Sequence, residues 1–320
     1  MQTMLNIATN VDTNCVMTKY LICVVGPTAI GKTALSIKLA KYFDTEIISA
    51  DSRQFYKEMN IGTAVPTKEE LKQAKHHFIQ HISIEESYSV GDFEREAIIK
   101  LGELFKKKGV VIMVGGSGLY VDAVTKGLDD FPEIDESIRI KLNQELETKG
   151  LDYLQDKLKK LDIDAYNKIA LDNPRRVIRA LEVCIQTGKP YSSFLQKKEN
   201  KRSFDTIYIG LTAERKIIYD RINQRVDIMI KEGLVEEANN LIPKKHLNAL
   251  ETVGYKELFN YFDKEWTLDF AISEIKKNTR RFAKRQLTWY RKNEDVAWFD
   301  YQNPLEKIVN YLENILKKPA

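Results

Sequence analysis

Residues Gly26 to Thr33 read GPTAIGKT and fulfil the P-loop pattern G-x-x-x-x-G-K-[ST]. The apolar run YLICVV precedes them and a helical stretch, KTALSIKLAKYF, follows, which is the context that this motif requires. In such a loop, backbone N–H groups surround phosphate oxygens, Lys32 adds a positive charge and Thr33 offers its hydroxyl to Mg²⁺. The predicted phosphate-binding residues are Gly26, Pro27, Thr28, Ala29, Ile30, Gly31, Lys32 and Thr33.

A lone acid, Asp51, closes the next apolar run, EIISAD. Because the carboxyl ends of parallel strands line one crevice, we expect Asp51 beside the bound phosphates. Like-charge repulsion opposes that place unless the carboxylate has a function, such as accepting a proton. The structural alternative is an aspartate that caps a helix or a turn.

The later apolar run, VVIMVGGSG, ends in glycines and Ser117. Nucleotide-hydrolysing P-loop proteins carry an acid at the end of such a strand, where it holds the metal. The P-loop is typical of nucleotide-binding and ATP-binding proteins, but its missing partner acid argues against ATP hydrolysis.

Strand and helix patterns alternate from Tyr20, which predicts an α/β fold with a P-loop parallel sheet flanked by helices. Expected strands include FIQHISI and TIYIGLT, and Ser89 or Asp92 is expected to open a helix. Long helices are expected to finish the chain. The predicted core comprises residues 20–130 and 201–320, after a disordered tail at 1–19 in which Met17 could be the true start.

The pattern becomes helical after Phe131, which predicts an inserted all-helical subdomain at 131–200. Its clearest helix is NPRRVIRALEVCIQTGK, with Asn173 as N-cap, Pro174 at the first helical position and Gly188 as the stop.

Composition limits the class of protein. A chain of 320 residues with 43% hydrophobic residues can bury a substantial core, and a net charge of +4 is too small to imply a nucleic-acid partner by itself. Cys15, Cys23 and Cys184 are odd in number and lack C-x-x-C spacing, which favours a reducing compartment; we expect a cytoplasmic protein. No stretch is apolar enough to span a bilayer, so no membrane partner is expected.

A basic strip is predicted near the C-terminus, in ISEIKKNTRRFAKRQLTWYRKN. On a helical wheel, one half carries cations and no acid occurs among them, which favours a polyanion partner over an ordinary solvated face. The cations are Lys276, Lys277, Arg280, Arg281, Lys284, Arg285, Arg291 and Lys292. The apolar half is predicted to contain Ile272, Ile275, Phe282, Trp289 and Tyr290.

Two smaller arginine groups add to this charge. Arg175, Arg176 and Arg179 lie in the first turns of the insertion helix, where positive charge opposes the helix dipole unless an external anion offsets it. Arg221 and Arg225 lie one helical turn apart and could close over phosphates, or could form an exposed basic face.

These motifs together resemble the bacterial tRNA dimethylallyltransferases, also called tRNA isopentenyltransferases. The resemblance runs from about Tyr20 to Phe299, and Ser117 departs from the threonine that the family commonly has there. The matching stretches, in order, are GPTAIGKTALSIKLA, IISADSRQFYKEMNIGTAVPT, VVIMVGGSGLYVDAVTKGL, NPRRVIRALEV, VGYKEL and TRRFAKRQLTWYRK.

The resemblance implies transfer of the dimethylallyl group of dimethylallyl diphosphate to the exocyclic amine of the adenosine 3′ of the anticodon in tRNA, with Mg²⁺. The product is N6-dimethylallyladenosine. The implied partners are the donor and the tRNA anticodon arm, and we expect a monomer.

The resemblance also implies residue roles. Asp51 is the general base, and Ser117 and Arg139 stabilise the leaving diphosphate. The implied contacts to the target base and its neighbours are Asp51, Ser52, Arg53 and Gln54. The implied anticodon-arm contacts are Arg175, Arg176, Val177, Ile178 and Arg179 in the insertion, and Arg280, Arg281, Lys284, Arg285 and Gln286 in the basic helix.

Three other functions share parts of this pattern. A small-molecule P-loop kinase would use the P-loop and Asp51 but not the basic helix. A free-adenylate isopentenyltransferase would use the same donor without tRNA. A non-catalytic RNA-binding module would leave Asp51 without a role.

Overall fold

The structure is a computed structural model that describes residues 18–129, 131–195 and 201–317. The chain divides into two compact units, one of residues 1–125 and 202–320 and one of residues 126–201. The predicted insertion, residues 131–200, lies within the second range. Of the tail expected at 1–19, only Thr18 and Lys19 lie within the described residues.

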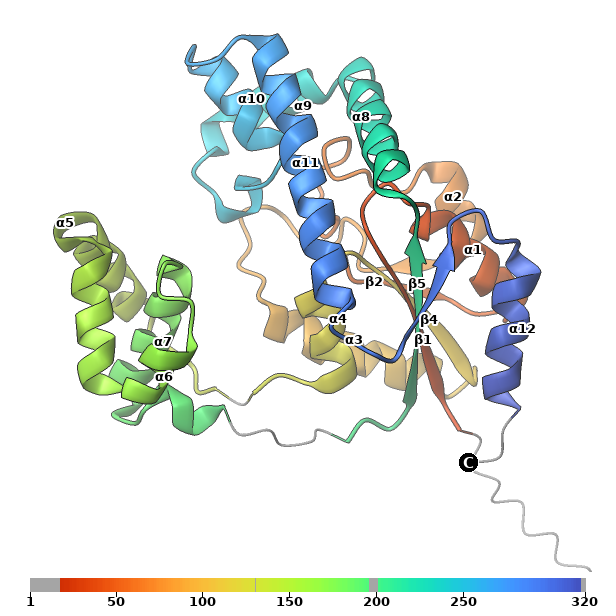
Figure 1. Ribbon diagram of the computed structural model, residues 1–320, viewed down its shortest axis with the longest axis horizontal. Helices are drawn as coiled ribbons and strands as arrows, with labels where there is room; N and C mark the ends of the chain where they lie inside the picture. Colours follow the sequence, from red (N-terminus) through yellow and green to blue (C-terminus); the bar gives the residue numbers. More distant parts are fainter. Residues whose placement is uncertain (1–17, 130, 196–200, 318–320) are drawn as a thin grey trace, which may run out of the picture. The chain divides into compact units, whose positions relative to one another are not determined.

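The larger unit is built on a parallel sheet, which confirms the predicted α/β class (Figure 1). Among the described residues the sheet has six strands in the order β3-β2-β4-β1-β5-β6, so the strand that leads into the P-loop lies inside the sheet. The strands are β1 Tyr20–Val25, β2 Ile47–Ser49, β3 His76–His77, β4 Val110–Val114, β5 Asp205–Thr212 and β6 Val296–Asp300.

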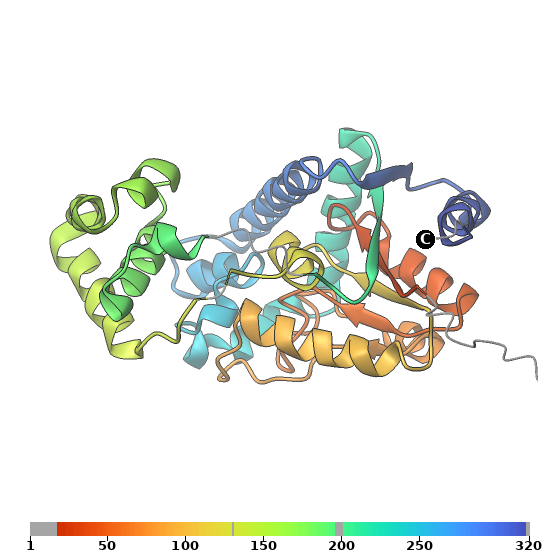
Figure 2. The same cartoon turned by 90° about the horizontal axis from the view of Figure 1, so that it is seen from below.

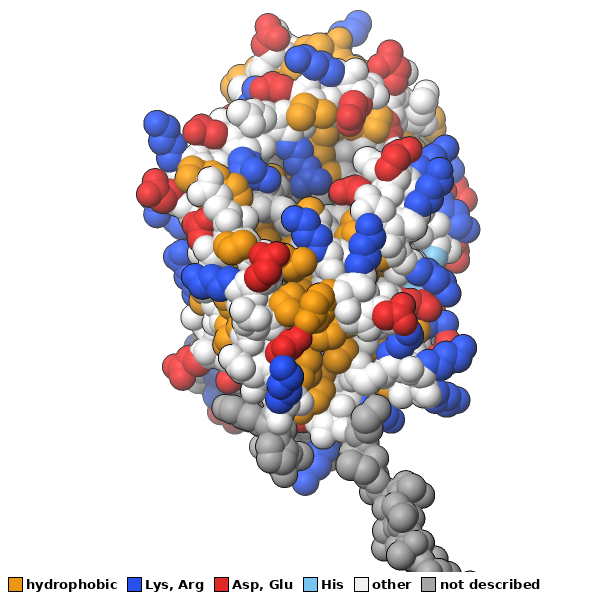
Figure 3. Space-filling model, turned by 90° about the vertical axis from the view of Figure 1, so that its right-hand side faces the viewer, with side chains coloured by type: hydrophobic (Ala, Val, Ile, Leu, Met, Phe, Trp, Pro, Cys, Tyr) orange, Lys and Arg blue, Asp and Glu red, His pale blue; other side chains and the backbone are white. Residues whose placement is uncertain are grey.

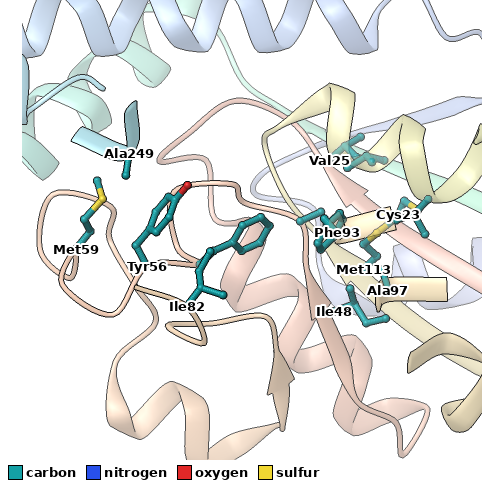
Figure 4. Packing of buried hydrophobic residues seen from close by; sticks show 14 of the residues in the cluster. Cys23, Val25, Ile48, Tyr56, Met59, Ile82, Phe93, Ala97, Met113 and Ala249 are labelled. Carbon is teal, nitrogen blue, oxygen red and sulfur yellow. The ribbon is translucent and has the colours of Figure 1, made fainter. Parts of the chain in front are cut away.

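Strand β1 is buried on both faces, as its unbroken apolar sequence predicts. Leu21 and Cys23 pack into one hydrophobic core, and Ile22 and Val24 pack into another, because successive side chains of a strand point to opposite faces. All four are 0% exposed. Figure 4 shows the first core, with Cys23 of β1 among side chains from neighbouring elements.

Helices cover both faces of this sheet (Figure 2). Apolar residues of α1, α8 and α12 contribute to the core on one face, and those of α3, α4, α9 and α10 contribute to the core on the other. Helix α11 places residues in both cores, and so does α8, because Val226 of α8 lies in the same core as Leu21 and Cys23 of β1. The helices of this unit are α1 Lys32–Tyr42, α2 Lys68–Gln73, α3 Val90–Leu104, α4 Gly118–Lys126, α8 Arg215–Lys231, α9 Leu234–Asn240, α10 Tyr255–Phe262, α11 Leu268–Tyr290 and α12 Leu305–Leu316.

One strand prediction is wrong, and one strand was missed. FIQHISI is not a strand: β3 ends at His77, and Phe78 and Gln80 have φ angles of 64° and 48°, which break an extended run. The sequence analysis also missed β6, because VAWFD is a short apolar run that follows a long helix and becomes a strand only by pairing with β5.

The smaller unit is helical, with α5 Glu136–Leu161, α6 Ile163–Lys168 and α7 Pro174–Thr187. The predicted ends of α7 are confirmed. The Asn173 side chain accepts a hydrogen bond from the Arg176 N–H, and Gly188 ends the helix in the left-handed conformation with φ 67°. Helix α5 is interrupted at Gly150, which has φ 81° and ψ 174°.

The surface on the right-hand side of Figure 1 mixes Lys and Arg with Asp and Glu around an apolar strip (Figure 3). This mixture is the ordinary pattern for a solvated surface and contrasts with the acid-free run of the sequence from Lys276 to Lys292. Within the part of the chain that the structure describes, none of the helices combines the length and apolar character needed to cross a membrane.

The helix predicted to begin near Ser89 gives a direct test of its start. The Ser89 hydroxyl accepts from the Asp92 N–H at 3.2 Å, and the Asp92 carboxylate accepts from the Ser89 N–H at 2.8 Å, which is a capping box. We expect Ser89→Ala to lower the free energy of unfolding by about 1 kcal/mol. Urea denaturation followed by circular dichroism measures this, and Ser87→Ala, at an exposed serine of the same loop, is the control. Equal midpoints for both variants would contradict the capping role.

Candidate active site

The P-loop joins the carboxyl end of β1 to the first turn of α1. Gly26 lies so close to β5 that a Cβ there would be 2.5 Å from the Leu211 carbonyl oxygen, and its φ is 136°. Helix α1 begins without a side-chain cap, because Gly31 is its N-cap residue. The first N–H groups of a helix without such a cap, together with the helix dipole, form an anion-binding site.

Burial disfavours the protonated, charged form of the Lys32 side chain. Its Nζ donates to the Pro27 carbonyl oxygen at 2.8 Å. Burial lowers the pKa of Lys32 to about 8; the Asp51 carboxylate opposes this shift, and the Arg225 guanidinium adds to it. A bound phosphate would supply the negative charge that favours the protonated ammonium.

Asp51 lies where two cavities meet. One cavity, of about 610 Å³, is also lined by Ser117 and Arg285, and the other, of about 700 Å³, by Lys32 and Thr33. Residues that line both are Thr28, Asp51, Thr63, Ala64, Arg225 and Met229. Asp51 therefore lines both the predicted phosphate site and a second space large enough for a ligand.

Asp51 also has the turn role that was its structural alternative. Its Oδ1 accepts from the Arg53 N–H at 3.1 Å, and its carbonyl oxygen accepts from the Gln54 N–H at 3.0 Å. One carboxylate oxygen thus orients the loop after β2, and the two roles are compatible.

Ser117 lies beside this loop, at the start of α4. Its hydroxyl accepts from the Ser52 N–H at 3.3 Å and is 3.2 Å from the Ser52 hydroxyl. The structure therefore brings the end of β4 next to the residue that follows Asp51, as parallel strands with a common edge require.

Arg221 and Arg225 of α8 lie against the P-loop. The Arg221 Nε donates to the Ala29 carbonyl oxygen at 2.8 Å, and an Arg225 guanidinium nitrogen lies 3.5 Å from the Thr28 hydroxyl. Burial lowers the pKa of Arg225, and the Asp51 carboxylate opposes that effect. Of the two alternatives for these arginines, the structure favours a place beside the phosphate site over an isolated basic surface.

Comparison with known proteins decides the family. The model of the family described as IPP transferase matches residues 54–293. The chain belongs to the IPP transferase family. The resemblance found in the sequence is thereby confirmed.

Relatives of this IPP transferase cover nearly its whole length. It is 63% identical over 298 residues to a tRNA dimethylallyltransferase of Christiangramia forsetii, covering 93% of this chain and 99% of that protein. It is 60% identical over 305 residues to a tRNA dimethylallyltransferase of Flavobacterium johnsoniae, with the same coverage of 93% and 99%.

Solved structures agree. The crystal structure of a tRNA isopentenylpyrophosphate transferase from Bacillus halodurans matches with a TM-score of 0.69 and 40% identity, over 93% of this chain and 97% of that one. A structure of a eukaryotic dimethylallyltransferase acting on tRNA matches with a TM-score of 0.81 and 26% identity, over 94% of this chain and 81% of that one.

Two of the predicted base-contacting residues of this IPP transferase are engaged within the protein. Arg53 donates to the Ala249 carbonyl oxygen at 2.9 Å. The Gln54 amide donates to the Thr63 and Ala64 carbonyl oxygens at 3.2 and 3.0 Å. Gln54 therefore holds Thr63 and Ala64, which line both cavities, while contact with a base stays a prediction.

Helix α11 confirms a basic surface but corrects its extent. Lys276 pairs with Asp227 at 2.6 Å and Lys277 pairs with Glu274 at 2.8 Å, so these cations are neutralised locally. Arg280 donates to the Asn223 side chain at 2.8 Å. The helix ends at Tyr290, before Arg291 and Lys292. The predicted tRNA contacts that remain exposed on the helix are Arg281, Lys284 and Arg285.

The apolar half of α11 was also predicted incorrectly in part. Phe282 and Trp289 are 37% and 41% exposed, whereas Ile275 and Tyr290 are buried as expected. Gln286 is 5% exposed, and both ends of its amide are hydrogen-bonded to backbone groups, so the predicted tRNA contact by this side chain is not supported.

The helical unit separates its predicted residues into surface and core. Arg175 and Arg176 are exposed, but Val177 and Ile178 are 0% and 6% exposed and pack in the core of the unit, which corrects their assignment as tRNA contacts. The other two arginines, Arg139 and Arg179, both pair with the fully buried Glu182. The role of Arg139 toward the diphosphate stays a prediction.

The P-loop residues fit a magnesium ion that would be held mainly by phosphate oxygens of a bound diphosphate. Among the described residues, histidine, cysteine, aspartate and glutamate do not gather in any group of three or more that could hold a metal ion. Mg²⁺ prefers oxygen ligands and is commonly held by one or two protein groups plus substrate phosphates. Thr33, in the wall of the P-loop cavity, offers such an oxygen.

The sequence analysis assigned no role to the segment Gly62–Ala64, which lines the first cavity, although it lies within a matching family stretch. The Glu237 carboxylate holds this segment by accepting from the Ile61 and Gly62 N–H groups at 2.8 and 2.9 Å. The signal available in the sequence was IGT, a glycine followed by a hydroxyl residue; only the fold places it opposite the P-loop.

The charge of Lys32 predicts a pH dependence. Because its pKa in the free protein is about 8, binding of dimethylallyl diphosphate should weaken as pH rises from 7 to 9.5, since more of the ligand must bind a neutral lysine. Lys32→Met should bind more weakly at pH 7 and show little of this dependence. Isothermal titration calorimetry at several pH values measures both. A parent affinity that is unchanged across this range would contradict the shifted pKa.

Proposed function

We propose that this chain is a tRNA dimethylallyltransferase, which moves the dimethylallyl group of dimethylallyl diphosphate to the exocyclic amine of the adenosine 3′ of the anticodon. The observation that carries the proposal is the position of Asp51. It lines both the cavity that contains Lys32 and Thr33 of the P-loop and the cavity that α11 lines with Phe282 and Arg285. The names of the relatives and of the structural neighbours support the same activity.

On the donor side, the P-loop holds a diphosphate that acts as a leaving group. As the bond between the allylic carbon and the diphosphate oxygen breaks, the electron pair stays on the oxygen and negative charge grows there. Lys32, Arg221 and Arg225 surround the loop and stabilise that charge. Thr33 would hold Mg²⁺, which when bound supplies further neutralisation of the diphosphate.

On the acceptor side, Asp51 is the general base. The adenine amine is a weak nucleophile because its lone pair is delocalised into the ring, so a carboxylate that orients the amine and accepts its proton accelerates formation of the nitrogen–carbon bond. The hydroxyls of Ser52 and Ser117 lie 3.2 Å from each other, and both residues line the same cavity as Asp51. The base must leave the stack of the anticodon loop to reach Asp51, as in other enzymes that modify bases.

RNA docking is assigned to the exposed cations. Arg281, Lys284 and Arg285 on α11 lie on the larger unit, which also carries the two cavities, and Arg175 and Arg176 provide charge on the helical unit. Contacts to phosphates position an RNA without reading its sequence, so selection of the adenosine falls to the residues near Asp51.

The direct test is incubation of the protein with unmodified tRNA, dimethylallyl diphosphate and Mg²⁺, followed by mass spectrometry of the digested nucleosides. We expect a dimethylallyl adduct on one adenosine of the anticodon loop and no ATP consumption. Cleavage of ATP in step with modification would favour a kinase. A product formed with free adenylate but not with tRNA would favour the free-adenylate enzyme.

The role of Asp51 is tested best by Asp51→Asn, because asparagine can keep the hydrogen bond to the Arg53 N–H while losing the basic carboxylate. We expect the single-turnover transfer rate to fall by roughly 10²- to 10⁴-fold with little change in tRNA affinity. Ser117→Ala should reduce the rate less. A transfer rate in Asp51→Asn close to that of the parent would reduce Asp51 to its turn role.

The basic helix is tested by the salt dependence of tRNA binding. Arg281→Ala, Lys284→Ala and Arg285→Ala should each lower affinity and reduce the log–log slope by roughly 0.7 to 0.9, the effect of losing one phosphate contact. Lys277→Ala is the matched control on the same helix, because Lys277 is paired with Glu274. If the control changes the slope as much as the three exposed sites do, the assignment of phosphate contacts to them is wrong.

A further inference from the structure

A buried amide joins two loops of the site. The Gln286 Oε1 accepts from the Thr28 N–H of the P-loop at 2.8 Å, and its Nε2 donates to the Gly116 carbonyl oxygen at 3.0 Å. Thr28 lines both cavities, and Gly116 precedes Ser117. One side chain, 5% exposed, therefore links the loop after β1 to the loop after β4.

Close packing makes this link specific. A Cβ on Gly116 would lie 2.1 Å from the Gln286 Nε2, so glycine at this position lets the amide approach the backbone. Replacing Gln286 by an apolar side chain would leave a buried donor and a buried acceptor without this partner. Both the oxygen and the nitrogen of the Gln286 amide therefore have a backbone partner of the complementary kind.

The same helix carries the cations assigned to RNA. Arg285 is adjacent to Gln286 and exposed, and Lys284 and Arg281 are exposed on the preceding turns. On the buried side, the Tyr290 hydroxyl lies 3.5 Å from the Gly115 carbonyl oxygen. Helix α11 therefore contacts RNA with one side, under the proposed function, and the donor-site loops with the other.

We infer that Gln286 is a positioning residue that couples the two substrates. Its amide holds the P-loop turn and the Ser117 loop in one arrangement relative to α11. RNA that fixes the position of α11 would therefore also favour the loop arrangement that binds the diphosphate. Coupling of this kind is reciprocal: the donor must raise the affinity for RNA by the same factor by which RNA raises the affinity for the donor.

The experiment is a binding cycle without chemistry. It uses an anticodon stem-loop in which purine riboside replaces the target adenosine, because that base lacks the amine that reacts. The affinity for dimethylallyl diphosphate with Mg²⁺ is measured without and with saturating stem-loop, for the parent, for Gln286→Met and for Thr288→Ala. Thr288 is the matched control because it is exposed on the same helix and its hydroxyl donates to the Lys284 carbonyl oxygen of that helix.

We expect the stem-loop to raise donor affinity in the parent and in Thr288→Ala by a factor between about 5 and 150, the usual range of coupling between two ligands. In Gln286→Met the factor should fall below about 2 while affinity for the stem-loop alone is kept. A merely structural role would weaken donor binding equally with and without RNA and leave the factor unchanged, which would overturn the inference. Absence of coupling in the parent would also overturn it.

If Gln286→Met does not fold, Gln286→Glu is measured in its place. Glutamate can accept from the Thr28 N–H but cannot donate to the Gly116 carbonyl oxygen, so only the second half of the link is lost. A coupling factor equal to that of the parent would then overturn the inference, and a reduced one would support it. Because the inference rests on the proposed function, dimethylallyl transfer by the parent to a normal tRNA is assayed separately. Lack of transfer would contradict the proposed function, whereas transfer without coupling of the two affinities would contradict only the inference about Gln286.

Discussion

The site depends on an uncapped helix N-terminus that a fully buried strand holds in place. Strand β1 is enclosed between two hydrophobic cores, with Leu21 to Val25 at 0% exposure, so its carboxyl end cannot move without disrupting both cores. The P-loop leaves this end at Gly26 and leads into α1, whose first turn lacks a side-chain cap. Free backbone N–H groups are therefore presented at a rigid point of the sheet, and the groups that use them must gather there.

Crowded positive charge is the main electrostatic feature around that point. Lys32, Arg221 and Arg225 converge on the loop, and burial lowers the pKa of Lys32 and of Arg225. Asp51 offsets part of this charge and lines both cavities, including the one that α11 lines with Phe282 and Arg285. An incoming diphosphate would relieve the repulsion among the cations, and the carboxylate would remain available for a proton on its other side.

Helix α11 illustrates how one element serves a surface and a buried site at once. Its exposed cations are suited to the RNA backbone, and its buried face supplies Gln286 to the P-loop. The rings of Phe282 and Trp289 on the same helix are also partly exposed, and Phe282 lines the cavity that contains Asp51. Helices that bury only apolar residues could not make this connection, because the loop backbone presents polar groups that need a polar partner.

The sequence alone was sufficient for features that depend on local patterns. The P-loop, the burial of β1, the start of α3 at Ser89 or Asp92, the capping of α7 by Asn173 and the change from an α/β to a helical pattern all follow from residue order within short windows. The family was also readable, because its motifs occur in a fixed order along the chain. The expectation that Asp51 lies beside the P-loop followed from the rule that the carboxyl ends of parallel strands line one crevice, and Asp51 does line the cavity that contains Lys32 and Thr33.

Other features required the tertiary structure because they depend on contacts between distant segments. VAWFD becomes β6 only by pairing with β5, and His76–His77 is the extent of β3 because left-handed residues follow it. A helical wheel could not distinguish Lys277, which is paired, from Arg281, which is exposed, nor could it show that Gln286 is buried against Thr28 and Gly116. Charge and polarity belong to the residue type and can be read from the chain, whereas burial and pairing depend on which segments the fold brings together.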